Sequence, residues 1–558
     1  MLRKGLILVL AIILVAGMLA GCGGKQETPP ASQDTEKSGK YGGIFRMAIN
    51  ANPPELDPNM ATDTTSSRIM YQIFEMLVDI DPEGEIVPCL AESWEVKDGG
   101  KRYIFKLRKG VRFHATTEGG KPTANGGREV TADDWVWTFN RILNPKNNAK
   151  RAYFLDMIKG YKDLQEGKTD KIEGVRKIDD YTLEIELEYP FGAFLSVLAY
   201  NSFAVLPRED VEKWGDQFNF HPVGTGPFKF EEWVQDDRLV LSRNENYWRV
   251  DEEGNRLPYL DGIEHRIIPD YSMQWTEFKL GNFESIDFVD TPYYREAKAN
   301  YPDSFFERPQ MGTYYYGMCM ELEPFKNNKA LRQAMNYAID REALIDLVED
   351  GRGTPARGLL PPGMFGYNPE LKGYEYNPEK AKQLLKEAGY PNGLKITLQY
   401  NTSDRHKRIA EALQQQYKAV GIDVELKNVD WGAHLDACEK GEVPFFRMGW
   451  VVDYPDPDNF LYVLLNSANI GPQGNYTRFN HPEFDELTYK ARIETDQEVR
   501  RQLYQEAEKI AVEEAPMVFI FHYTTDRIVQ PYVKGFKLPS FGEYAAKYYD
   551  VWLDKDKK

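Results

Sequence analysis

Cysteine and histidine are scarce in this sequence. Its 558 residues include four cysteines and seven histidines. Cys89, Cys319 and Cys438 cannot all pair with one another, and none has the spacing of a metal ligand, so we expect buried single thiols. The histidines are scattered and form no His-Glu-x-x-His helix. We therefore expect neither a metal centre nor a metal cofactor.

Positive charge is also in deficit. Lys and Arg number 69 against 87 Asp and Glu, which gives a net charge of −18. Such a surface repels polyanions, so nucleic acid is not an expected partner. The 42% of hydrophobic residues is ample for folded cores, and the length predicts about three units at roughly 100–200 residues each.

Catalytic and phosphate-binding motifs are missing as well. There is no Walker-type glycine–lysine loop and no Gly-x-Ser-x-Gly elbow. Gly224–Gly226 is followed by Pro227 and a strand-like segment, so it cannot open a helix onto a phosphate. We expect a binding protein that is no enzyme and holds no cofactor. A catalytic pair of carboxylates, as in glycoside hydrolases, has no sequence motif and would not stand out among 87 acidic residues. An exported hydrolase therefore stays an alternative.

The one long apolar run lies at the N-terminus. Two positive charges precede it, and no charge follows until after Gly24. This layout predicts a secretory signal peptide over residues 1–21; a membrane helix is the alternative, but the run is short and broken by Gly17. Leu19–Cys22 resembles a lipoprotein box, which implies cleavage before Cys22 and acylation of its thiol. Removing the signal's two positive charges would change the net charge from −18 to −20. Residues 22–40 are polar and predict a flexible tether.

Strand and helix signals alternate from Tyr41 onward, which predicts α/β layers with mixed sheets. One helix is expected to start from the N-cap Asn377, run to Ala388 and stop at Gly389. Another is expected over Asp404–Val420, closed by Gly421. We also expect a hairpin over Arg102–His114, one helix over Lys329–Val348 and a surface loop over Gly351–Pro369.

The segment Phe445–Phe460 combines an arginine, a glycine, three acids and five aromatic residues. Alternate residues of a strand share one side, so Arg447, Gly449, Val451 and Asp453 are expected to face a cleft together. A ligand with a positive and a negative end, such as a peptide, fits this pattern. The alternative is structural: Asp453 caps the following Pro-rich turn, and Arg447 pairs with a surface acid.

The chain resembles the family-5 extracellular solute-binding proteins, which serve oligopeptide and dipeptide ABC transporters. Ordered motifs along nearly the whole mature chain carry this resemblance, namely Leu56–Pro58, Phe74–Val78, Leu90–Trp94, Tyr103–Arg108, Val111–His114, Thr131–Asp134, Val223–Phe228, Asn244–Trp248, Phe325–Arg341 and Ala381–Tyr390.

The resemblance implies a two-lobed, clamshell fold of the type II periplasmic-binding-protein kind, with a subdomain inserted in the first lobe. Lobe 1 is expected over residues 41–65, 195–310 and 520–558, the inserted subdomain over 66–194, and lobe 2 over 311–519. The chain is expected to cross between the lobes near Pro309–Tyr315 and Ala515–Tyr523.

The resemblance also implies ligand-binding roles. Asp453 matches the aspartate that pairs with a peptide's α-ammonium, and Arg447 matches the arginine that serves its carboxylate. His406 is expected near the carboxylate end, and Trp431 is expected to line side-chain pockets. The backbone of Gly449–Val451 is expected to pair with the peptide.

The function expected from this resemblance is that of the substrate-binding component of an ABC importer. It would capture oligopeptides between the lobes and deliver them by lobe closure to a permease with its ATPase subunits. An oligosaccharide receptor of the same architecture is the alternative. We expect a monomer that is exported and lipid-anchored to the outer face of the cell membrane, or facing a periplasm.

Overall fold

The computed structural model describes residues 39–286 and 288–554. The predicted signal peptide, Cys22 and nearly all of the tether lie outside these residues. From Lys40 onward the chain forms one compact unit. None of the helices in the described ranges is both long enough and apolar enough to cross a membrane.

A five-stranded mixed sheet organises the first region, which we call lobe 1. Its order is β10-β11-β12-β1-β13, with β1 parallel to both β12 and β13. The strands and helices of this region are β1 (Ile44–Ile49), α1 (Thr64–Ile73), α4 (Phe194–Leu198), α5 (Arg208–Trp214), β10 (Phe228–Val234), β11 (Arg238–Arg243), β12 (Gly262–Ile267), α6 (Tyr271–Lys279), β13 (Ser285–Ile286), α7 (Thr291–Asn300), β20 (Val533–Lys534) and β21 (Trp552–Leu553).

A four-stranded antiparallel sheet of order β4-β5-β9-β8 lies within the segment predicted as the inserted subdomain. Helix α2 covers it, and the Asp134 carboxylate accepts a hydrogen bond from the Thr131 N–H at the start of α2. The elements of this segment are β2 (Val78–Ile80), β3 (Ile86–Pro88), β4 (Ala91–Lys97), β5 (Arg102–Leu107), β6 (Thr116–Thr117), β7 (Lys121–Pro122), α2 (Ala132–Leu143), α3 (Tyr161–Gln165), β8 (Val175–Asp179) and β9 (Thr182–Glu186).

A six-stranded mixed sheet organises the second region, which we call lobe 2. Its order is β15-β19-β14-β18-β16-β17. The elements are β14 (Phe305–Met318), α8 (Lys329–Tyr337), α9 (Arg341–Val348), β15 (Thr354–Pro355), α10 (Pro378–Glu387), β16 (Leu394–Asn401), α11 (Asp404–Ala419), β17 (Ile422–Val429), α12 (Trp431–Glu439), β18 (Phe445–Val451), α13 (Leu461–Leu465), α14 (Pro482–Ile493), α15 (Gln497–Glu514) and β19 (Met517–Ile528).

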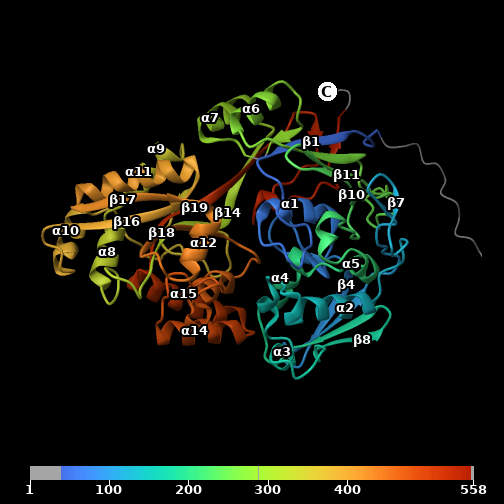
Figure 1. Cartoon of the computed structure of the whole chain (residues 1–558), viewed down its shortest axis with the longest axis horizontal. Coiled ribbons are helices and arrows are strands. Elements are labelled where there is room, and N and C mark those ends of the chain that lie inside the picture. The colour runs from blue at the N-terminus through green and yellow to red at the C-terminus, as the bar shows by residue number, and fades with distance from the viewer. Residues whose placement is uncertain (1–38, 287, 555–558) are drawn as a thin grey trace, which may run out of the picture. The chain divides into compact units, whose positions relative to one another are not determined.

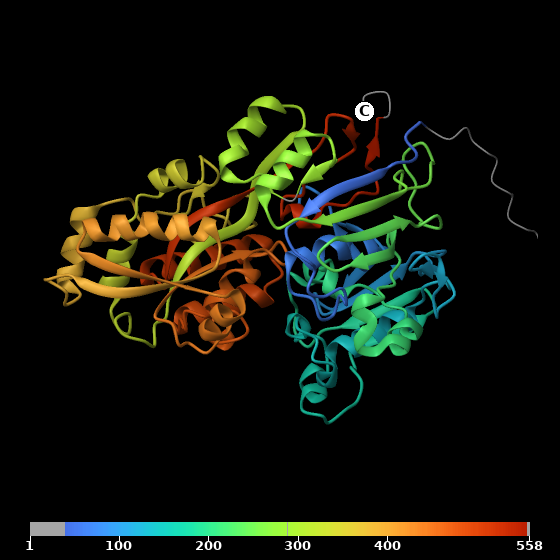
Figure 2. The ribbon, with the colours of Figure 1, turned by 45° about the horizontal axis from the view of Figure 1, so that its top comes forward.

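The two segments expected as lobe crossings lie in β14 and β19, the longest strands described. They pair antiparallel from Phe305 opposite Ile528 to Gly317 opposite Met517. Figures 1 and 2 show both strands running from the half that holds β16 and β17 toward the half that holds β1. The predicted lobe boundaries themselves stay a prediction.

Three local predictions are wrong, two for tertiary reasons and one because of a local helix cap. The segment after β5 does not return as a hairpin, because β5 pairs instead with β4 and β9. The predicted helix over Lys329–Val348 is two helices, since the Asp340 side chain accepts the Ala343 N–H and starts α9. The expected surface loop Gly351–Pro369 is partly internal, with Leu359 and Leu360 buried.

The three cysteines of the folded unit, Cys89, Cys319 and Cys438, are buried and free, as expected from their spacing. Helix α10 begins at its predicted N-cap, and α11 begins at Asp404 as predicted, on an N-cap that was not among the predictions. Asn377 accepts the Lys380 N–H at the start of α10, and Ser403 accepts the His406 N–H at the start of α11. Local capping signals were therefore reliable where a single side chain satisfies the helix end.

Candidate functional site

Strand β18 has one open edge. The backbone N–H and C=O groups of its even-numbered residues bond to β14. At the two ends of the ladder, the Pro444 carbonyl accepts the Cys319 N–H, and the Val452 N–H donates to the Met311 carbonyl. The odd-numbered backbone groups therefore point the other way. Strand β16 pairs with β18 only at Phe445 and Phe446, so no strand in the described part of the chain covers the rest of this edge.

Gly449 and Val451 occupy the centre of the open edge. On either side of them the outward backbone groups have partners: the Arg447 carbonyl accepts from His434, and the Asp453 N–H donates to Asn459 Oδ1 at 2.9 Å. The N–H and C=O groups of Gly449 and Val451 are thus oriented to pair with an added extended chain.

Arg447 lies at one end of this edge and is 9% exposed. Its guanidinium lies 4.7 Å from the centre of the Tyr314 ring, and Nη1 donates to Asn401 Oδ1 at 3.3 Å. No carboxylate of the described residues forms an ion pair with it, and Nε has no hydrogen-bond partner among them. The alternative of a surface ion pair is therefore not realised, and this buried cation retains capacity for an anion.

Two further basic side chains lie near Arg447. Arg405 donates two hydrogen bonds to the buried Glu349 carboxylate through Nε, at 3.0 and 2.9 Å. His406 Nδ1 and the Tyr314 hydroxyl are 3.2 Å apart. Burial, followed by the charges of Arg447 and Arg405, lowers the pKa of His406. Among the described residues, Glu349 is the one acid in ion-pair contact with either Arg405 or Arg447, so this end of the edge keeps a net positive charge that favours an anion.

Trp431 begins helix α12 and is 46% exposed. Its ring centre lies 6.0 Å from that of His434, the residue that contacts the Arg447 carbonyl. Trp431 therefore stands beside the open edge, with most of an aromatic face free to contact side chains of a ligand.

Asp453 lies at the other end of the edge. Its Oδ2 atom is 3.6 Å from Arg151 Nη2, which comes from the inserted segment. Burial raises the pKa of Asp453, and the Arg151 charge opposes this rise. The following turn is capped by Asp456, which accepts the Asp458 N–H at 3.0 Å. The capping role that was the alternative for Asp453 thus belongs to its neighbour.

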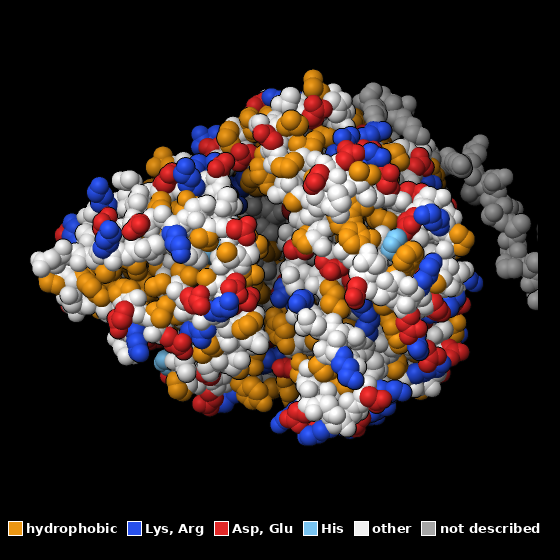
Figure 3. All heavy atoms as spheres, in the orientation of Figure 1, with side chains coloured by type: hydrophobic (Ala, Val, Ile, Leu, Met, Phe, Trp, Pro, Cys, Tyr) orange, Lys and Arg blue, Asp and Glu red, His pale blue; other side chains and the backbone are white. Residues whose placement is uncertain are grey.

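A pocket of about 790 Å³ lies between residues of the two lobes. Lobe 1 contributes residues such as Arg68 and Tyr271, and His406 is the one predicted site residue among the lining. The lobe 2 residues of the lining are Ser403, Asp404, Arg405, His406 and Arg408. Figure 3 shows the surface hollowed between the half that carries α10 and the half that carries α2. The volume is in the range of small-molecule and peptide sites.

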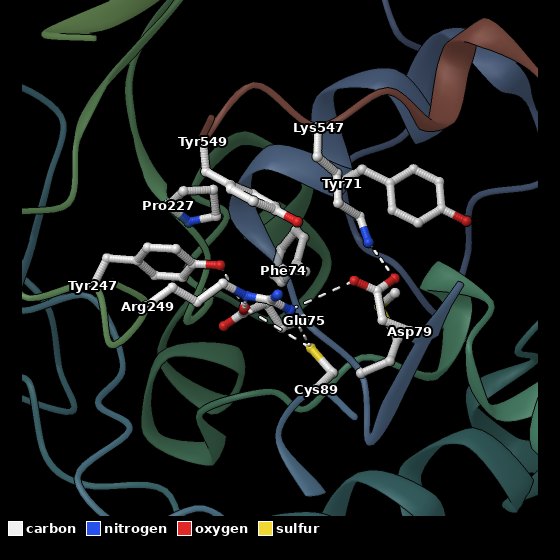
Figure 4. Close-up of a pocket in the computed structure, with 11 residues that line it drawn as sticks. Tyr71, Phe74, Glu75, Asp79, Cys89, Pro227, Tyr247, Arg249, Lys547 and Tyr549 are labelled. Carbon is white, nitrogen blue, oxygen red and sulfur yellow. Dashed lines mark hydrogen bonds and ion pairs between the residues drawn. The ribbon is translucent and has the colours of Figure 1, made fainter. Parts of the chain in front are cut away.

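A second polar cavity provides a contrast (Figure 4). Arg249 and Lys547 face Asp79 there, and Glu75 accepts hydrogen bonds from Tyr247 and Trp248. Two acids balance two cations, and the cavity of about 10 Å³ has room for at most about one water. We interpret it as a satisfied internal cluster. Among the described residues no group of acids, cysteines and histidines is arranged to hold a metal.

The sequence matches the family model of the bacterial extracellular solute-binding proteins, family 5, over residues 85–472. The chain belongs to this family. It is similar to the Heme-binding protein A of Haemophilus influenzae at 33% identity, covering 96% of this chain and 97% of that relative. It is also similar to the Dipeptide-binding protein of Escherichia coli at 32% identity, covering 88% and 92%.

Solved structures of family members give the same fold. The periplasmic binding protein DppA from Helicobacter pylori, in complex with the peptide STSA, has a TM-score of 0.79 at 30% identity and covers 92% of this chain and 99% of its own. OppA from Haemophilus influenzae, in complex with RPPGFSPFR, has a TM-score of 0.78 at 27% identity, with 93% and 100% covered. The predicted α/β, two-lobed periplasmic-binding-protein fold is confirmed.

The structure brings together the site residues predicted in this family-5 chain. His406, Arg447, Gly449, Val451 and Trp431 lie in lobe 2, on or near the open edge. Asp453 lies at the far end of that edge. Their roles toward a ligand stay predictions.

Sequence reasoning missed Arg151, Arg405 and Tyr523. A Cβ on Gly449 would overlap the Tyr523 hydroxyl, so Tyr523 packs on the face of the sheet at Gly449. Arg405 was within reach of a sequence argument, because it precedes His406 on the same helix. Arg151 comes from a segment some 300 residues before Asp453, and no local pattern indicated it.

Proposed function

We propose that this chain is the substrate-binding component of an ABC importer and that it captures peptides in the cleft between its lobes. It would hold the peptide backbone on the open edge of β18, the carboxylate near Arg447 and the α-ammonium at Asp453. Curated relatives are named for haem, dipeptides and oligopeptides, so the ligand class is part of the proposal. Two similar solved structures hold peptides.

The buried guanidinium of Arg447 carries this proposal. A buried charge without a counter-ion costs several kcal/mol, on the order of 3–5 when one partner of a pair is lost, and it is retained only where something compensates it. A ligand carboxylate would do so. The uncovered edge beside it supports an extended peptide over a globular ligand, because main-chain pairing needs only a backbone.

Capture would require no chemical step. Lobe closure would be favoured only by the contacts that the peptide adds to the closed state, and the permease would recognise that state.

We further propose that acylated Cys22 anchors the monomeric chain to the outer face of the membrane. Replacing Cys22 by Ser should release the chain into the soluble fraction and leave its peptide affinity intact. Retention in the membrane fraction would contradict the anchor.

The test is Asp453→Asn against a series of tripeptides by isothermal titration calorimetry. We expect at least a tenfold loss of affinity for Ala-Ala-Ala, about 1.4 kcal/mol, because the ammonium loses its counter-charge. The N-acetylated peptide should bind wild type weakly and should lose nothing further in the variant. Asp404→Asn, at a lobe 2 aspartate that lines the interlobe pocket away from the strand edge, is the matched control.

Two outcomes would overturn the proposal. One is unchanged tripeptide affinity in Asp453→Asn. The other is binding of a neutral oligosaccharide such as cellotriose with no binding of any tripeptide, since a sugar has no ammonium for Asp453 to meet.

A further inference from the structure

Arg151 and Asp453 form an incomplete pair across the cleft. Their closest atoms, Nη2 and Oδ2, are 3.6 Å apart, too far for a hydrogen bond. Both side chains are mostly buried, with 16% and 13% of their surface exposed. Arg151 Nε and Asp453 Oδ2 have no hydrogen-bond partner of good geometry among the described residues. The Tyr200 hydroxyl lies near both groups, but it is neutral and supplies neither with a counter-charge. Each therefore keeps capacity for a third group.

Two other arginine–aspartate pairs of this chain are joined directly by hydrogen bonds. Arg500 donates to both oxygens of the buried Asp456, at 2.9 and 3.0 Å. Arg128 donates two hydrogen bonds to Asp134, at 2.9 and 2.6 Å. The Arg151–Asp453 pair lacks such bonds, as does the buried Arg352–Asp526 pair at 3.5 Å. What distinguishes Arg151–Asp453 is its place at the end of the open edge of β18.

Charge balance shows what third group would fit. The pair by itself is neutral. An α-ammonium that binds Asp453 leaves Arg151 as a buried cation without a counter-charge, which is costly. A ligand residue that carries both an ammonium and a carboxylate would satisfy both side chains and restore neutrality.

The surroundings of the pair contain no other carboxylate that serves Arg151. Its Nη1 donates to the Tyr153 hydroxyl at 3.3 Å, and its guanidinium lies 5.3 Å from the centre of the Phe154 ring. Asp453 is the only acid of the described residues within ion-pair distance of it. An anion that relieves Arg151 must therefore come from the ligand or from Asp453 itself.

We propose that Arg151 is a specificity-determining residue which makes this subsite select peptides whose first residue has an acidic side chain. This inference rests on the proposed peptide-binding function and deepens it. Asp453 holds the α-ammonium of the first residue, and Arg151 holds the carboxylate of that residue's side chain. Both contacts are completed only when the inserted segment meets lobe 2.

The experiment compares Glu-Ala-Ala with Gln-Ala-Ala, which differ in one charge and hardly in shape. Calorimetry on wild type should give at least a tenfold tighter Kd for the Glu peptide. In Arg151→Met the ratio of the two Kd values should fall to about one, while Gln-Ala-Ala stays bound. Arg151→Lys keeps the positive charge and should keep part of the preference for Glu-Ala-Ala. Its binding of peptide would also show that a variant at this position folds.

Arg492→Met is the matched control. Arg492 is a buried arginine of lobe 2 that contacts Asp156 of the inserted segment at 3.2 Å and does not contact Asp453. Its replacement removes a cation from the contact between these regions and should leave the Glu-to-Gln preference at its wild-type value.

Three results would overturn the inference. Wild type could bind both peptides equally, or the preference could persist in Arg151→Met. Arg151→Met could also tighten both peptides by the same factor, which would make Arg151 a latch between the lobes. If wild type binds neither these nor any other tripeptide, the proposed function itself fails; equal binding of both leaves that function standing.

Discussion

Arg447 and Asp453 stand at the two ends of one strand edge and are held in different ways. The neighbours of Arg447, namely Tyr314, Asn401 and Tyr523, all belong to lobe 2. Asp453 faces Arg151, which comes from the inserted segment. The Arg447 end is thus formed within one lobe, whereas the Asp453 end is completed by a second region of the chain.

This difference separates two tasks of a binding cleft. A subsite formed inside one lobe recognises a feature common to all ligands before closure, because its groups are already in place. A subsite completed across the cleft adds its contacts only in the closed state, so its ligand contacts favour closure. Selectivity placed at the second end is therefore coupled to closure.

The largest expected effect is on the unfolding free energy and concerns Glu508, a buried residue of lobe 2. Glu508 is buried and accepts the Leu360 N–H at 2.7 Å; the neighbouring Leu359 carbonyl accepts the Thr313 hydroxyl of β14. Burial raises the pKa of Glu508 from 4.5 to about 7. Its contribution to stability is full below pH 4.5, where both states are protonated. It is lost as pH rises to about 7, because the unfolded state releases its proton first.

Glu508→Gln should remove this loss. Urea unfolding should give similar free energies for variant and wild type at pH 4.5, and about 3 kcal/mol more for the variant at pH 7.5. Peptide affinity should stay unchanged. A stability difference that is constant with pH would contradict the buried, protonated state of Glu508.

The second prediction concerns the Arg447 end. Arg447→Met should weaken peptides with a free carboxylate by about 2 kcal/mol, roughly thirtyfold, and C-terminally amidated peptides far less. The unfolding free energy of the ligand-free protein should not fall, since a buried charge without a counter-ion is removed. Equal losses for free and amidated peptides would show that Arg447 does not meet the carboxylate.

A smaller effect is expected from Gly449→Ala, which tests the edge between the two ends. The new methyl group would overlap the Tyr523 hydroxyl, so we expect a loss of about 1–2 kcal/mol in unfolding free energy. Tyr523→Phe in the same chain removes the hydroxyl and should recover most of this loss. If the double variant Gly449→Ala/Tyr523→Phe is no more stable than Gly449→Ala alone, the loss does not come from overlap with the Tyr523 hydroxyl.

The smallest effect concerns His406. Because burial and the two nearby arginines lower its pKa, the imidazole stays neutral from pH 5.5 to 8. The ratio of peptide affinities between His406→Gln and wild type should be the same at both pH values in calorimetry. A ratio that changes with pH would show that the imidazole becomes charged in the cleft.

The sequence predicted much of the lobe 2 site. The alternation of Arg447, Gly449, Val451 and Asp453 indicated a shared edge because side chains and backbone groups repeat every two residues along a strand. Family resemblance added His406 and Trp431. The hairpin after β5 was mispredicted since strand pairing depends on which segments meet in space, and β9 lies some 80 residues further along the chain.

The sequence by itself determined the fold class and the family, and it predicted the lobe 2 residues of the candidate site. These follow from local periodicity, capping residues and ordered motifs. Only the tertiary structure decided that Arg447 has no counter-ion in the described chain and that Arg151 faces Asp453. Both facts depend on which of many charges come within a few ångströms of each other, and that is set by packing between segments hundreds of residues apart.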